Sequence, residues 1–112
     1  MSVASQDSGS ARIVTVTEPR IDAALAIRFK DDMRAATRDG PDRVILDLAG
    51  VEFVDSSGLG AIVASMKQLG ANRRLDLAGL TPLVEKVFRL TRMDAVFRIY
   101  NSVDTALAGH PD

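Results

Sequence analysis

Residues 43–60, RVILDLAGVEFVDSSGLG, contain the pattern on which the fold of this chain depends. Residues 43–48 are almost continuously apolar, which is typical of a β-strand that is covered on both faces. A second short apolar run ends at Asp55, and two serines and two glycines then begin the stretch 56–69. Its apolar residues recur at helical spacing: Leu59, Ile62, Val63 and Met66. A buried strand followed by an amphipathic helix indicates an α/β protein.

Three further segments have the composition of strands. Residues 12–18 are rich in β-branched residues and alternate between two faces, with Val14 and Val16 together on one of them. Residues 74–78 alternate in the same way, and residues 96–100 are predicted to form the last strand.

Helices are predicted between these strands. They cover residues 23–37 and 56–69, a segment that begins at Pro82, and a short final segment that ends at Leu107. Pro82 suits a first helical position, and Gly70 suits the residue that ends a helix. The expected N-caps are, in chain order, Asp22, one of the two serines Ser56 and Ser57, Thr81, and Asn101 or Ser102.

Strands and helices thus alternate in the order β(β)αβαβαβα, which implies crossover connections and mainly parallel strands. The bracketed strand lies in residues 1–10, which form either a strand and hairpin or a frayed end. A hairpin there would add an antiparallel edge to the sheet. We predict an α/β fold in a single domain over residues 1–112, with a four- or five-stranded mixed sheet. Its core covers about residues 12–108, and residues 1–10 and 109–112 are potentially loose.

The composition excludes several classes of protein. The chain has 112 residues, a formal net charge of −1 and no cysteine. It has no basic stripe for duplex nucleic acid and no thiolate metal site or disulfide. Residues 1–12 lack the features of a signal peptide, and no apolar run is long enough to span a membrane. We therefore expect a cytoplasmic protein that binds neither nucleic acid nor membranes.

Few residues are suited to catalysis. The only histidine is His110, which lies near the end of the chain, where a catalytic base would lack a fixed position. The serine elbow G-x-S-x-G is absent, which argues against a hydrolase that uses Ser56. We expect no catalytic residue and no enzymatic activity.

The sequence offers residues for two other kinds of site, a nucleotide site and a metal site. Gly58 and Gly60 form only half of a nucleotide-binding fingerprint, because position 63 is Val, so a role in close packing is favoured. Asp22, Asp47 and Asp55 could gather at one end of the sheet and bind a metal. Capping and turn roles are commoner for such acids, so no metal is expected.

Ser56 and Ser57 have two possible roles. A serine that precedes an apolar helical run usually caps the helix. Judged from local chemistry alone, a modified serine that acts as a switch is the minority interpretation.

The segment Val44–Gly60 resembles the signature of the anti-sigma factor antagonists, which are bacterial members of the STAS family. Its matching parts are the apolar strand that ends in Asp-Leu, the short connection with Phe, and Asp-Ser-Ser-Gly-Leu-Gly. Other segments match in the same order and extend the resemblance to about residues 12–108. They are Arg20–Ala23, Leu80–Val84, Leu90–Asp94, Val96–Tyr100, Ser102 and Ala106–Leu107. The chain departs from the family at Pro19 and Arg92, where glycine is common, so loop geometry there is in question.

The resemblance implies a binding protein that is switched by phosphorylation. In the family the first serine after the Asp accepts phosphate, and here this is Ser56, with Ser57 as second choice. The implied partners are an anti-sigma serine kinase with an ATP-binding fold of the histidine-kinase type and a metal-dependent serine phosphatase. The unphosphorylated form would bind the kinase and free a sigma factor or another client. The chain itself would need no cofactor, and we expect a monomer that forms at most a weak homodimer.

The resemblance also implies a docking face around the serines. Asp55 would position the Ser56 hydroxyl or help the partner to recognise it, and Asp22 would contribute near the first helix. Ser57 would serve mainly as a cap or helix-start residue, and Gly58 and Gly60 would allow close approach. Leu59 would pack inward or offer an apolar contact. The residues assigned to partner binding are Asp22, Asp55, Ser56, Ser57, Gly58, Leu59 and Gly60. The alternative function is a nucleotide-sensing module of STAS type or a soluble subunit of a transport complex.

Overall fold

Five strands form the main sheet of the protein, in the spatial order β1-β2-β4-β6-β7. The structure is a computed structural model that describes residues 1–109. Strand β1 pairs antiparallel with β2, and the other neighbours are parallel. The bounds of these strands are β1 Val3–Ser8, β2 Ala11–Val16, β4 Arg43–Asp47, β6 Arg74–Ala78 and β7 Ile99–Tyr100. The predicted mixed α/β sheet is therefore confirmed.

The first strand answers a question that the sequence left open. β1 pairs with β2 along its full length, from Val3 opposite Val16 to Ser8 opposite Ala11. Both the amide and the hydroxyl of Ser2 donate hydrogen bonds to Oδ2 of Asp32, each at 2.7 Å. These bonds, the backbone one above all, hold the pKa of Asp32 below its ordinary value. The N-terminal strand is thus tied to the helix that carries Asp32.

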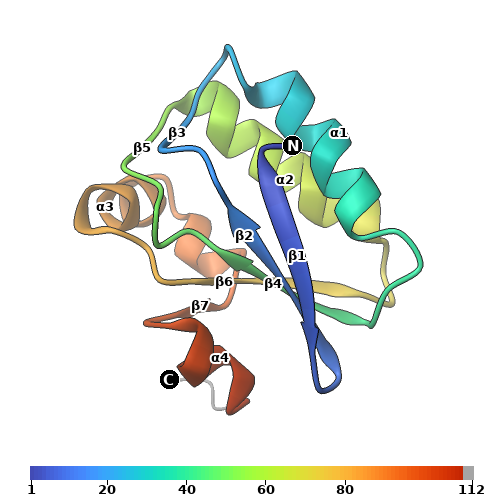
Figure 1. Ribbon diagram of the computed structural model, residues 1–112. Coiled ribbons are helices and arrows are strands. Elements are labelled where there is room, and N and C mark those ends of the chain that lie inside the picture. The colour runs from blue at the N-terminus through green and yellow to red at the C-terminus, as the bar shows by residue number, and fades with distance from the viewer. Residues whose placement is uncertain (110–112) are drawn as a thin grey trace.

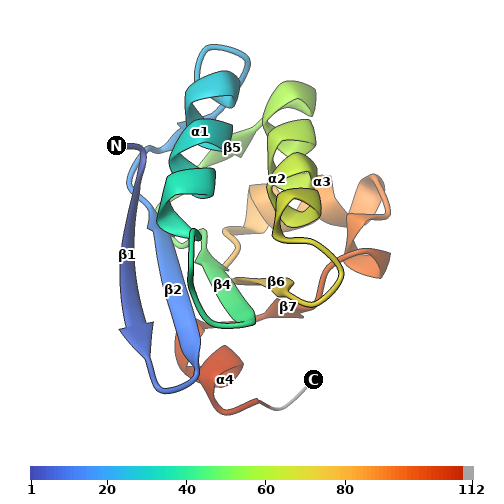
Figure 2. The ribbon, with the colours of Figure 1, turned by 90° about the vertical axis from the view of Figure 1, so that its right-hand side faces the viewer.

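Helices cover both faces of the sheet, as Figures 1 and 2 show. Helices α1, α2 and α3 contribute to the larger core on one face, and α4 packs on the other face. Their bounds are α1 Ala26–Ala36, α2 Ser56–Leu69, α3 Pro82–Leu90 and α4 Val103–Leu107.

Strand β4 contributes to the core on both faces of the sheet. Val44 and Leu46 belong to the larger core, whereas Ile45 belongs to the smaller core, which includes Tyr100 and Ala106. All three β4 residues are fully buried. The nearly continuous apolar run of this strand is the expected consequence of being covered twice.

A second, two-stranded sheet was not predicted. It consists of β3, Arg20–Ile21, and β5, Phe53–Val54, which pair in parallel. The carbonyl oxygen of Pro19 accepts hydrogen bonds from the amides of Glu52 and Phe53, at 2.7 and 3.3 Å. This small sheet brings the segment before α1 beside the segment before α2, side by side in Figure 1.

The last strand is shorter than predicted. The sequence indicates a strand over 96–100, but only Ile99 and Tyr100 belong to β7. A 3₁₀ turn, η1, covers Met93–Ala95, and Arg92 before it has a φ of +63°. The chain turns through η1 before it can join the sheet, so β7 begins only at Ile99, and the carbonyl oxygen of Arg98 accepts the first hydrogen bond from β6.

The backbone of Arg92 yields a testable prediction. In the left-handed conformation the Cβ of a side chain is crowded by the backbone, whereas glycine has no Cβ and adopts it readily. Glycine is common at this position in the family that the sequence resembles. Arg92→Gly should raise the free energy of unfolding by about 0.5–1 kcal/mol, measured by urea denaturation. Arg92→Ala, which keeps the Cβ, should leave it nearly unchanged. If both variants stabilise the protein equally, the effect comes from loss of the Arg side chain, and the backbone explanation is contradicted.

Candidate functional site

The start of helix α2 is capped by Asp55 and not by a serine. Asp55 has extended backbone dihedrals, and its Oδ1 accepts a hydrogen bond from the amide of Gly58 at 2.8 Å. The amide of Leu59 donates to the carbonyl oxygen of Asp55, also at 2.8 Å, which begins the helical hydrogen bonds. The expected serine cap is therefore wrong, because the preceding acid occupies that position.

This correction changes the chemical situation of Ser56. As the first residue of α2, it has a hydroxyl that is not engaged in capping. Ser56 and Ser57 are both exposed, and within residues 1–109 the structure gives neither hydroxyl a hydrogen-bond partner. The first amides of an α-helix have no carbonyl one turn earlier, and Asp55 satisfies only that of Gly58. An exposed hydroxyl thus lies beside backbone donors that can face an anion.

Asp55 also joins two segments that are far apart in the sequence. Its Oδ2 accepts a hydrogen bond from the amide of Ala23 at 3.1 Å, and its own amide donates to the carbonyl oxygen of Ile21 at 3.3 Å. Ile21 is paired with Val54 in the small sheet. The start of α2 is therefore held against the segment that leads into α1.

Gly58 lies where no side chain fits. It is buried, and a Cβ at this position would overlap the carbonyl oxygen of Ile21. Gly60 is different, because it is exposed and a Cβ there would meet open space. Close packing was expected of both glycines, but of the two only Gly58 is needed for packing inside the protein.

Asp22 caps a turn and not the helix itself. Its Oδ1 accepts a hydrogen bond from the amide of Leu25 at 3.2 Å, and α1 begins only at Ala26. The predicted helix over 23–37 with Asp22 as N-cap is therefore wrong at its start. A separate turn occupies the first residues because the small sheet ends immediately before them, at Ile21.

Two further side chains border the site and were missed from the sequence. The guanidinium of Arg20 lies 4.2 Å from the ring centroid of Phe53, and its Nε lies 3.4 Å from Oδ2 of Asp22. Arg20 and Phe53 are directly opposite in the small sheet, so only the unpredicted pairing of β3 with β5 brings them together.

The remaining candidates are placed as follows. Leu59 is half-buried and packs against the larger core. Of its two expected roles, inward packing and an apolar contact for a partner, the structure agrees with inward packing. Asp47 is half-buried, and its Oδ1 accepts a hydrogen bond from the amide of Ala49. It lines a cavity with Asn101 and Asp104 and does not join Asp22 and Asp55.

Two structural observations concern other kinds of site. Among residues 1–109, no group of three or more His, Cys, Asp or Glu side chains is placed to hold a metal. In the same part of the chain, every helix is too short or too polar to span a membrane. His110 lies outside the described residues.

Gly58 and Gly60 form a matched pair for mutagenesis. Gly58→Ala should lower the free energy of unfolding by at least about 2 kcal/mol, because the methyl group would displace the backbone at Ile21. Gly60→Ala should raise it by about 0.5–1 kcal/mol, because alanine is the better helix former and has room there. Thermal and urea unfolding would measure both changes. If Gly58→Ala is tolerated as well as Gly60→Ala, α2 does not approach β3 as described.

Comparisons with known proteins agree with this architecture. A family model described as the STAS domain matches residues 2–106. BtrV of Bordetella bronchiseptica is 30% identical over 89 residues, which cover 79% of this chain and 77% of that protein. The anti-sigma-F factor antagonist RsfB of Mycobacterium tuberculosis is 25% identical over 89 residues, which cover 80% of this chain and 73% of RsfB.

A crystal structure is similar along almost the whole chain. It is that of an anti-sigma factor antagonist from Mycobacterium paratuberculosis, with a TM-score of 0.85 and 27% sequence identity. The match covers 98% of this chain and 93% of that one. With the family model, which matches nearly all of the described residues, these similarities establish that the chain belongs to the STAS domain family.

Proposed function

We propose that this protein is an anti-sigma factor antagonist and that phosphorylation of Ser56 controls its binding to an anti-sigma kinase. RsfB and the crystal structure from M. paratuberculosis both carry the name of anti-sigma factor antagonist. The observation that carries the proposal is the exposed Ser56 hydroxyl at the start of α2. Because Asp55 performs the capping, Ser56 can be modified without removing a bond that holds the helix.

The start of α2 can tolerate a phosphate. A phosphoserine adds about −1.5 to −2 charges and three acceptor oxygens. The amides at a helix N-terminus and the helix dipole favour a negative charge there. Asp55 and Asp22 lie close by and oppose it, whereas the cation of Arg20 lies beside Asp22. We therefore expect the fold to remain intact after phosphorylation.

The same phosphate would disrupt a protein interface. In the proposed complex the exposed serines lie against the kinase, with Asp22 and Asp55 at the edge of the contact. A phosphate there adds bulk, a desolvation cost, and repulsion from any acidic group of the partner. A loss of only about 3 kcal/mol would lower the affinity roughly 150-fold. Ser56 would then act as a local gate on docking, with little change of shape.

The other participants follow from this proposal. The kinase supplies ATP and the phosphoryl-transfer chemistry, and a metal-dependent serine phosphatase restores the binding form. The unphosphorylated protein, acting in the cytoplasm as a monomer, would hold the kinase and free its sigma factor or other client. Ser57, also exposed, is the second candidate for phosphorylation.

The experiment that tests the switch is phosphorylation by candidate anti-sigma kinases from the same genome. The protein is incubated with each kinase and ATP, and the phosphate is located by mass spectrometry. We expect one phosphate on Ser56, which disappears in Ser56→Ala and persists in Ser57→Ala. Phosphate on Ser57 alone would contradict the assignment.

Binding provides the control for this experiment. Ser56→Ala should bind the kinase about as tightly as the unmodified protein, and Ser56→Asp should bind it at least about tenfold more weakly. Lys86→Glu on α3, an exposed charge change outside the docking face, should leave the affinity within about twofold. If no kinase modifies the chain and neither Ser56 variant changes binding, the proposed switch is wrong.

A further inference from the structure

A second surface lies at the opposite end of α2, where strand β6 has an unpaired edge. β7 pairs only with Leu77 and Ala78, so Arg74–Asp76 have no neighbouring strand on that side among residues 1–109. Within residues 1–109, backbone hydrogen bonds across this edge begin with the one from Leu77 to Arg98, at 2.9 Å. The amide of Arg74 instead donates to Asp42, on the β4 side. Because strand residues alternate, the amide and carbonyl of Leu75 face the open edge.

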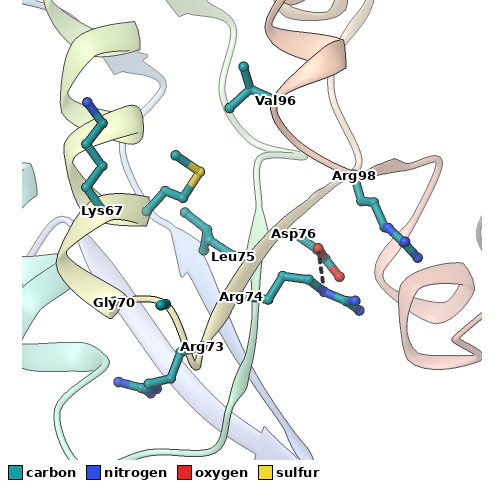
Figure 3. Close-up of a pocket in the computed structure, with 10 residues that line it drawn as sticks. Lys67, Gly70, Arg73, Arg74, Leu75, Asp76, Val96 and Arg98 are labelled. Atoms are coloured by element: carbon teal, nitrogen blue, oxygen red, sulfur yellow. Dashed lines mark ion pairs between the residues drawn. The ribbon is translucent and has the colours of Figure 1, made fainter.

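A cavity of about 480 Å³ adjoins this edge (Figure 3). Its apolar lining comes from Met66 at the end of α2, Leu75 of β6 and Val96 before β7. Val96 is 48% exposed, which leaves apolar surface uncovered beside the unpaired backbone. The cavity thus offers both backbone hydrogen-bonding groups and an apolar floor, the two features with which a sheet edge accepts an added strand.

The rim of the cavity is strongly basic. Its lining includes four basic residues and one acid: Lys67, Arg73, Arg74, Arg98 and Asp76. Asp76 is buried and lies 3.0 Å from Nε of Arg43 and 3.1 Å from Nε of Arg74, so its charge is compensated locally. Arg73 donates to the carbonyl oxygens of Thr37 and Pro41. The positive charge that remains for a partner lies mainly on Lys67 and Arg98, which are exposed.

These charges lie on both sides of the strand edge. Figure 3 shows Lys67 and Leu75 on one side of β6 and Arg74 and Arg98 on the other. An added strand would also alternate, so one set of its side chains would face Met66 and Val96, and the other would face Arg74 and Arg98. Apolar side chains suit the first set and carboxylates suit the second.

We propose that the β6 edge is a docking site for an extended segment of a partner protein in which acidic and apolar residues alternate. The segment would exchange hydrogen bonds with the amide and carbonyl of Leu75 and place a carboxylate against Arg98, whose charge is not compensated by Asp76. A second copy of this chain that pairs through the same edge would bring like charges together, so the rim selects for an acidic partner. α2 has 14 residues and is about 20 Å long, so this surface is separate from Ser56 and does not rest on its proposed phosphorylation.

The test uses a fluorescein-labelled probe peptide, Val-Glu-Val-Glu-Val-Glu, in fluorescence anisotropy and in ¹H–¹⁵N NMR titration. We expect saturable binding, a shift of the Leu75 amide resonance and slower hydrogen exchange at Leu75. Arg98→Glu should weaken binding at least about tenfold, and Lys86→Glu, outside the cavity, should change it by less than about twofold. Both replaced side chains are exposed, so neither variant should impair folding.

Two further probes separate strand addition from general attraction of anions. A block peptide, Val-Val-Val-Glu-Glu-Glu, has the same charge but cannot alternate, and inorganic polyphosphate has no peptide backbone. Both should bind at least about tenfold more weakly than the alternating peptide. Equal binding of all three probes, no saturable binding of the alternating peptide, or an unperturbed Leu75 amide in its presence would each overturn the proposal.

Discussion

The carboxylate of Asp55 is the interaction on which the geometry of the candidate site depends. One oxygen holds the amide of Gly58 and thereby starts α2, and the other holds the amide of Ala23 ahead of α1. Each is a hydrogen bond from a backbone amide to a charged acceptor, which is stronger than a neutral one. A single side chain thus holds the start of α2 against the turn before α1, which lies 32 residues earlier in the sequence.

The same arrangement makes Ser56 available for chemistry. If the serine capped α2, its hydroxyl would be engaged and a phosphate would remove the cap. Because the acid before it takes this role, the hydroxyl is exposed and its modification leaves the hydrogen bonds of Asp55 in place. Gly58 is the second requirement, since only glycine lets α2 lie against the carbonyl of Ile21. The docking proposed for this surface therefore needs a fixed position for the start of α2 and a free Ser56 hydroxyl. The residues Asp55–Gly58 provide both.

Much of this fold could be predicted from the sequence, and each exception has its own physical reason. β4, α2 and β6 were predicted to within a residue because burial on both faces, helical spacing and alternation leave strong patterns. The pair β3–β5 leaves no such pattern, because each strand has only two residues and is defined by its hydrogen-bonded pairing with the other strand. The contact of Arg20 with Phe53 was missed for the same reason. A serine was expected as the cap of α2 because both Asp and Ser suit that position, and only the geometry distinguishes them. β7 was predicted too long because VFRIY has strand composition, while the turn at Arg92–Ala95 delays the start of the strand to Ile99.

The most direct test of the central claim compares the unphosphorylated protein with the form phosphorylated on Ser56. Backbone amide NMR spectra and affinity for the cognate anti-sigma kinase would be measured on both forms. The account predicts resonance changes confined to Ser56–Gly58 and Ala23, unchanged amides in β4 and β6, and an affinity loss of about 100-fold or more. Equal affinity of the two forms would contradict the switch, and spectral changes throughout β4 and β6 would show that phosphorylation acts by refolding and not as a local gate.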